Sequence, residues 1–156
     1  MHFSIALTTL AALAPLVSAV GDAIVVNNCK AAVHLWSVGG AVGPEVTLNP
    51  GEEFTEKVHY DAKSGGIAIK ITRPVDGLYT GAPQTDFAYT LDGNNLWYDL
   101  SDVFGDPFSG KVLSVKASNP DCPDICWSSG ISPAGSQTKV CGAAANITLT
   151  LCAAKC

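Results

Sequence analysis

Hydrophobic and polar residues alternate along much of this chain with the two-residue period of a β-strand. The clearest example is the segment 146–152, where Ile147, Leu149 and Leu151 are separated by polar threonines. Successive side chains of a strand point to opposite faces, so this pattern predicts one face on a core and the other in water. The segment 66–72 has isoleucine at every second position and predicts another half-buried strand.

Other short apolar or β-branched segments end at turn residues and are also predicted to be strands. They span residues 23–26, 32–38, 45–48, 54–60, 86–91, 96–100 and 112–117. Asp92-Gly93 between two of them indicates a hairpin. After residue 19, no stretch of eleven or more residues keeps the apolar spacing of a helix. The pattern therefore predicts an all-β sandwich with at most a turn or two of helix.

Residues 118–142 do not follow the alternating pattern. They contain three cysteines, three prolines and many serines and glycines. We expect a small, irregular cysteine-rich segment that disulfides hold in place.

The N-terminal segment has the features of an export signal. Residues 5–17 form an apolar run that is too short to span a bilayer as a helix. Val17 and Ala19 place small residues at the −3 and −1 positions of a cleavage site after Ala19. The alternative is a buried N-terminal helix or strand, and no Lys or Arg precedes the run. We predict a signal peptide at 1–19 and a single domain at 20–156.

Charge narrows the set of partners. The chain has fourteen acidic and nine basic residues, all after residue 19, and a net charge of −5. Such a surface repels a phosphate backbone, so nucleic-acid binding is not expected. There is no second long apolar segment and no hydrophobic tail for a lipid anchor. We therefore expect a soluble, extracellular monomer that is not bound to a membrane.

Six cysteines follow the predicted cleavage site. An even number in an exported chain indicates three disulfides, for which fifteen connectivities are possible. A metal cluster is the alternative, but three residues separate Cys122 from Cys126 and no His lies nearby. His34 and His59 alone are too few ligands for a stable site. We expect neither a metal nor a cofactor.

Asn146-Ile147-Thr148 is a sequon for N-glycosylation. In the alternating strand, Asn146 shares the predicted wet face with Thr148 and Thr150, where a glycan can be accommodated. The alternative is an ordinary strand residue that remains unmodified.

Several short blocks, taken in order, carry a family resemblance. They are IVVNNC at 24–29, VHLW at 33–36, LNPGE at 48–52, GGIAIK at 65–70, DFAYTL at 86–91, WYDLSD at 97–102 and ITLTLC at 147–152. Together they resemble the thaumatin-like proteins, and most closely the small fungal branch named for a yeast-phase-specific antigen of Blastomyces. The resemblance implies a thaumatin-like sandwich whose first and last strands are tied by Cys29–Cys152. The other four cysteines then pair among themselves, and we favour Cys122–Cys141 and Cys126–Cys156.

The resemblance also points to a cleft. Larger thaumatin-like proteins carry an acidic cleft, and some bind or slowly cleave β-1,3-glucan. Asp99 matches one acidic residue of this cleft, whereas Ala88 and Phe104 stand where two other acidic residues are expected. The basic residue of the cleft corresponds to Lys70 or Arg73. Glycoside hydrolysis needs two carboxyl groups. Three further aspartates lie nearby in sequence, Asp86, Asp102 and Asp106. Acidic side chains at turns, however, more often hydrogen-bond to the nearby backbone or face solvent.

These observations favour a non-catalytic secreted protein, antigen-like or effector-like and free or associated with the cell wall. We expect it to bind a cell-wall polysaccharide such as β-glucan, or a host protein, through the cleft side around Asp99, Trp97, Phe104 and Asp102. A weak β-1,3-glucanase using Asp99 and a structural wall protein are the alternatives. Trp36 and Trp97 alternate with polar residues and are predicted to lie on partly exposed faces, where stacking on sugar competes with ordinary packing.

Overall fold

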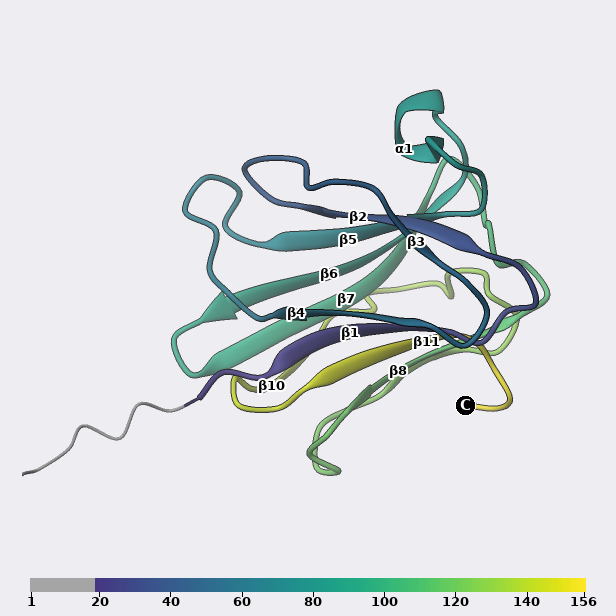
Figure 1. Ribbon diagram of the computed structural model, residues 1–156. Helices are drawn as coiled ribbons and strands as arrows, with labels where there is room; N and C mark the ends of the chain where they lie inside the picture. Colours follow the sequence, from purple (N-terminus) through teal and green to yellow (C-terminus); the bar gives the residue numbers. More distant parts are fainter. Residues whose placement is uncertain (1–18) are drawn as a thin grey trace, which may run out of the picture.

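The computed structural model describes residues 19–156, and two β-sheets packed face to face make up the fold (Figure 1). The first sheet contains, in spatial order, β4 (Glu53–Lys57), β1 (Asp22–Asn27), β11 (Ile147–Ala153), β8 (Val112–Ala117) and β9 (Ile125–Trp127). The second contains β10 (Lys139–Gly142), β7 (Asn95–Val103), β6 (Gln84–Asp92), β5 (Ile67–Thr72), β2 (Val33–Val38) and β3 (Val46–Leu48). Within the described residues the helix is a single turn, α1 (Gly77–Thr80). The all-β prediction is confirmed. The predicted signal at 1–19 lies outside the described residues, apart from Ala19.

The core lies between the sheets and follows the alternation of the sequence. Along β11, Ile147, Leu149 and Leu151 are fully buried, and the residues between them are partly exposed. Ile69 of β5 and Phe87 of β6 are buried on the facing sheet. Each buried side chain of this size stabilises the fold by about 1.5–3 kcal/mol relative to exposure, so a register slip of one residue in these strands is strongly disfavoured.

The first and last strands lie side by side. β1 pairs with β11 in parallel, and the disulfide Cys29–Cys152 joins the ends of the two strands across 123 residues of sequence. The other disulfides are Cys122–Cys141 and Cys126–Cys156, the pairs that the resemblance favoured. All six cysteines are therefore paired: one disulfide ties the C-terminal strand to the first strand, and the other two cross-link residues within the C-terminal third of the chain.

The segment 118–142 is more regular than its composition predicts. It contributes β9 and β10, and Ile125 and Trp127 of β9 are almost fully buried. The indole Nε1 of Trp127 donates a hydrogen bond to Gln137 Oε1 at 3.2 Å. The Tyr98 hydroxyl donates to the carbonyl of Pro123. Core packing as well as disulfides therefore holds this segment in place.

Candidate functional site

The hairpin of β6 and β7 has one face that points away from the core. Its two-residue turn has Gly93 at φ 58, a conformation that glycine adopts without strain. In the register of the hairpin, Ala88 lies opposite Asp99 and Thr90 lies opposite Trp97. Tyr98, between Trp97 and Asp99 in β7, is buried. Because successive side chains of a strand point to opposite faces, the side chains of Trp97 and Asp99 both lie on the outer face of the sheet.

A shallow pocket of ≈ 250 Å³ lies on this face, and we call it the Trp97 pocket. Its lining residues are Ala88, Tyr89, Thr90, Trp97, Tyr98, Asp99 and Thr138. The Trp97 side chain is 42% exposed, and Val140 of β10 lies beside it in register. Asp99 is partly buried and accepts a hydrogen bond from the backbone N–H of Leu100 at 2.8 Å. The pocket thus combines an exposed indole, a carboxylate and two threonines.

Phe104 does not belong to the Trp97 pocket. It follows the end of β7, five residues beyond Asp99, which corresponds to about 17 Å along a strand. Its side chain is 71% exposed and its backbone has a φ of 61. The sequence places Asp99 and Phe104 close together, but an extended strand separates them.

Asp102 also lies away from the pocket, on the inner face of β7. Its Oδ1 accepts a hydrogen bond from the hydroxyl of Thr85 at 2.5 Å, and within the described residues its buried Oδ2 has no partner. Burial, aided by Asp106, raises the pKa of Asp102 to about 7. The structure therefore brings together Asp99 and Trp97 of the predicted cleft residues, but not Asp102 or Phe104.

A second polar row crosses the same outer face. Lys70 of β5 lies opposite Asp86 of β6, and its Nζ is 3.0 Å from Asp86 Oδ2. Gln84 Nε2 donates to Asp86 Oδ1 at 3.0 Å. Both oxygens of Asp86 therefore have a hydrogen-bond partner, and the residue is only 8% exposed to solvent. Lys70, one of the two candidates for the basic cleft residue, thus pairs with an acid on this face.

The prediction that Trp36 lies on a partly exposed face is wrong. Trp36 does point to the outer side of its sheet, but it is 1% exposed. Tyr79 of α1 packs edge-on against it, with ring centroids 6.2 Å apart. The helical turn between β5 and β6 therefore covers the indole, a contact that strand alternation cannot reveal.

The asparagine of the predicted glycosylation sequon, Asn146, is partly exposed. Its Oδ1 accepts a hydrogen bond from the backbone N–H of Asp22 at 3.0 Å. Among residues 19–156, no three His, Cys, Asp or Glu side chains lie close enough to hold a metal ion. His34 Nδ1 instead lies 2.8 Å from Glu45 Oε1. In the same range, no helix is long and apolar enough to cross a membrane.

The parallel pairing of the first and last strands, the two-sheet core and the terminal disulfide define a small thaumatin-like β-sandwich. The model of a family described as Blastomyces yeast-phase-specific protein matches residues 10–153, and the chain belongs to this family.

Curated relatives agree with this assignment. The antigenic thaumatin-like protein of Arthroderma benhamiae is 33% identical over 138 residues, covering 84% of this chain and 69% of the relative. The secreted thaumatin-like protein calA of Emericella nidulans is 30% identical over 142 residues, covering 84% of this chain and 81% of the relative. The chain is thus a fungal-type thaumatin-like protein.

Solved structures support the fold. The protein elicitor MoHrip2 from Magnaporthe oryzae matches with a TM-score of 0.71 and 26% identity, over 85% of this chain and 99% of that one. The thaumatin-like xylanase inhibitor TLXI matches with a TM-score of 0.57 and 14% identity, over 84% and 99% respectively. At that identity, the second match bears on the fold alone.

Proposed function

We propose that this protein is secreted and binds cell-wall polysaccharide, without cleaving it, at the Trp97 pocket. The observation that carries the proposal is the 42% exposed indole of Trp97, which lines an open pocket on the outer face of the sheet. An exposed tryptophan offers a large apolar face on which a sugar ring stacks, while nearby polar groups bind its hydroxyls. Asp99, Thr90 and Thr138 supply such groups.

Secretion is supported by two observations. One relative is named as a secreted protein, and the fold contains three disulfides. Disulfides persist in oxidising compartments and outside the cell.

Binding is favoured over hydrolysis by the state of the carboxyl groups on this face. Asp86 and Asp99 are diagonal neighbours across the hairpin, which corresponds to about 7–8 Å. That separation suits two glycosidase acids, but Lys70 and Gln84 already occupy both oxygens of Asp86. With both oxygens engaged, Asp86 is not free to contact a glycosidic oxygen, so Asp99 has no available partner for acid–base catalysis.

Retention on insoluble β-1,3-glucan tests the proposal. We expect the wild-type protein to bind and Trp97→Ala to lose binding by at least about tenfold, because the stacking surface is removed. Tyr60→Ala is the matched control, since Tyr60 is a 62% exposed aromatic residue outside the pocket. No retention of the wild type, or equal loss in both variants, would overturn glucan binding at this site.

The same preparation tests the alternatives. Release of sugar from laminarin that Asp99→Asn abolishes would favour a weak glucanase. Wash-resistant association with wall ghosts, but not with purified polymers, would favour a structural wall protein. Either result would contradict non-catalytic polysaccharide binding as the main role.

Recognition of a host protein is a second candidate function. Phe104 is 71% exposed and is held at a positive φ, an unfavourable conformation for a bulky residue. An apolar side chain presented in this way suits a protein contact. A structural neighbour described as an elicitor also favours it. Loss of elicitation in plant leaf tissue by Phe104→Ser, with Trp97→Ala active, would assign this function to the Phe104 end.

A further inference from the structure

A larger pocket, of ≈ 430 Å³, lies beside the Cys29–Cys152 disulfide, at the end of the sandwich where β1 and β11 finish. We call it the cationic pocket. Its lining residues are Asn28, Cys29, Lys30, Ala31, Arg73, Gly110, Lys111, Val112, Cys152 and Ala153. Three of these residues are cationic and none is acidic. The pocket is separate from the Trp97 pocket and shares no residue with it.

This concentration of positive charge runs against the composition of the chain. The protein has a net charge of −5 and nine basic residues, of which Arg73 is the single arginine. Within residues 19–156, the ion pairs of lysine involve Lys57, Lys70 and Lys116. Lys30, Arg73 and Lys111 have no carboxylate partner among those pairs. Three unpaired cations around one pocket repel each other, and an anion bound between them relieves that repulsion.

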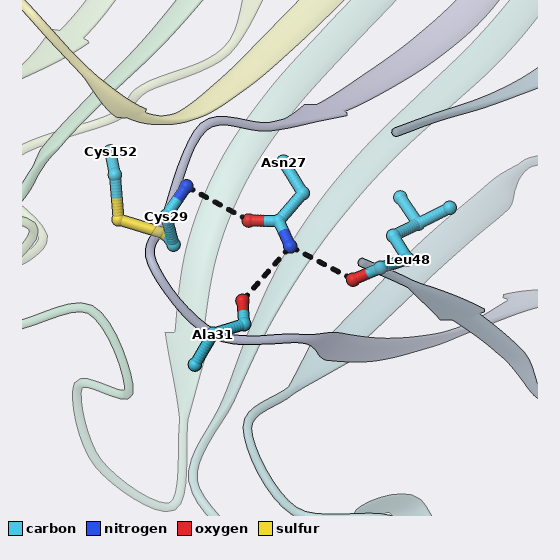
Figure 2. The surroundings of a disulfide bond; sticks show 5 residues. All are labelled: Asn27, Cys29, Ala31, Leu48 and Cys152. Carbon is cyan, nitrogen blue, oxygen red and sulfur yellow. Dashed lines mark hydrogen bonds between the residues drawn. A yellow bond between two sulfur atoms is a disulfide. The ribbon is translucent and has the colours of Figure 1, made fainter. Parts of the chain in front are cut away.

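One wall of the cationic pocket is held rigidly by a buried amide. Asn27 is fully buried, and its Nδ2 donates to the carbonyls of Ala31 at 3.0 Å and Leu48 at 2.8 Å. Its Oδ1 accepts from the backbone N–H of Cys29 at 3.0 Å. Figure 2 shows the Asn27 side chain spanning the loop beside the disulfide. The loop that carries Lys30 is therefore preorganised.

The other walls are also fixed. The guanidinium of Arg73 lies over the ring of the buried Phe108, 5.6 Å from its centroid. The backbone N–H of Lys111 donates to the carbonyl of Phe108 at 2.9 Å. β11 has a bulge at Cys152, which adopts a φ of 54. Bulges and positive φ angles in residues other than glycine often mark functional sites.

The lining indicates the class of ligand. A pocket of this size exceeds what a bare oxyanion fills and suits a single ring or a short oligomer. Ala31, Val112, Ala153 and the disulfide provide apolar surface, and the three cations provide charge. We propose that the cationic pocket binds an acidic sugar, a ring that bears a carboxylate or a phosphate. Arg73 holds the anionic group, and Lys30 and Lys111 stabilise it.

Titrations followed by amide NMR chemical shifts test this proposal. The probes are trigalacturonate, its uncharged methyl ester and glucose 6-phosphate, at low ionic strength. We expect shifts at Lys30, Lys111 and Ala153 with a charged probe, little effect of the ester, and weakening in about 0.5 M salt. Comparison of trigalacturonate with glucose 6-phosphate identifies the anionic group. No shifts with either charged probe, or equal shifts with the ester, would overturn the proposal.

Variants locate the site. Arg73→Gln is expected to weaken binding by about tenfold, and Lys30→Gln with Lys111→Gln by a similar factor, because each removes charge-assisted contacts. Lys63→Gln is the matched control, since Lys63 is exposed and lies outside the pocket. The lysine variants leave the contact of Arg73 with Phe108 intact, so their effect does not depend on packing. Equal weakening by Lys63→Gln would indicate non-specific attraction and contradict the proposal.

Discussion

Buried polar groups show how single residues determine the properties of this protein. Asp102 lies on the inner face of β7, the same face as the buried Leu100. Within the described residues, its buried Oδ2 has no hydrogen-bond partner. Burial disfavours the charged carboxylate, and this raises the pKa of Asp102 to about 7. A carboxyl group with a raised pKa in the folded state costs stability once it ionises.

Replacement of Asp102 by Asn should therefore stabilise the protein at pH 8. Between pH 4 and pH 7 the wild type loses stability as Asp102 ionises, because its folded-state pKa exceeds that of the unfolded chain. The Thr85 hydroxyl can still donate to the Asn side-chain oxygen. We expect a gain of about 1–2 kcal/mol at pH 8, discounted for partial exposure, and none at pH 4. Urea denaturation at several pH values measures it; an equal gain at pH 4 would contradict the ionisation argument. Asp92→Asn, at the exposed hairpin turn, is the control.

At the scale of elements, the loop between β1 and β2 depends on one side chain. Asn27 makes three hydrogen bonds to the backbone of this loop and its neighbour. The loop backbone is further fixed because the N–H of Asn28 donates to the carbonyl of Leu151 at 3.1 Å. A short loop with this many bonds contributes both to the stability of the connection between the two sheets and to the wall of the cationic pocket.

Asn27→Asp should destabilise the protein by about 3 kcal/mol or more at pH 7. The substitution keeps the size of the side chain but turns its donor into an oxygen that faces the carbonyls of Ala31 and Leu48 without water. Asn28→Asp is the matched control because Asn28 is exposed, and it should change stability by less than about 0.5 kcal/mol. Chemical denaturation measures both. Equal stability of the two variants would show that the buried amide does not hold the loop.

At the scale of the whole molecule, one disulfide joins the two ends of the fold, and the other two cross-link its C-terminal part. Cys29–Cys152 closes a loop with a sequence separation of 123, and Cys122–Cys141 closes one of 19. The entropy that a crosslink removes from the unfolded chain grows slowly with loop length. The terminal disulfide is therefore the stronger constraint on the unfolded state.

Replacing both cysteines of Cys29–Cys152 by alanine should lower stability by about 5 kcal/mol, compared with about 3 kcal/mol for Cys122–Cys141, in the chain-entropy model. Thermal or urea unfolding of the two double variants measures the difference. The reverse order of stability would mean that native-state packing around Cys122 and Cys141, rather than loop entropy, dominates.

Strand alternation identified most of the fold. Ile147, Leu149 and Leu151 were predicted to face a core and do so, because the two-residue period is a local property of an extended backbone. The buried state of Trp36 was not predictable in this way, since Tyr79 covers it from a separate loop. The strands in segment 118–142 were missed because they are short and lie among cysteines, prolines, serines and glycines, which are typical of irregular structure.

The candidate site was predicted in part. Trp97 and Asp99 lie two residues apart in one strand, so their shared face follows from the sequence. Asp102 is three residues beyond Asp99 and therefore points to the opposite face, while Phe104 lies at the far end of the strand. Their separation follows from the exact length and register of β7, which the sequence pattern had ended at residue 100.

The sequence alone determined which residues alternate, how many cysteines are available, the negative net charge and the family to which the ordered blocks point. These are local or additive properties of the chain. Only the tertiary structure brought Lys30, Arg73 and Lys111 to one pocket, because Lys30 follows β1, Arg73 follows β5 and Lys111 precedes β8, and these strand ends lie at one end of the sandwich. Contacts between residues distant in sequence depend on strand order and packing, and no local pattern encodes them.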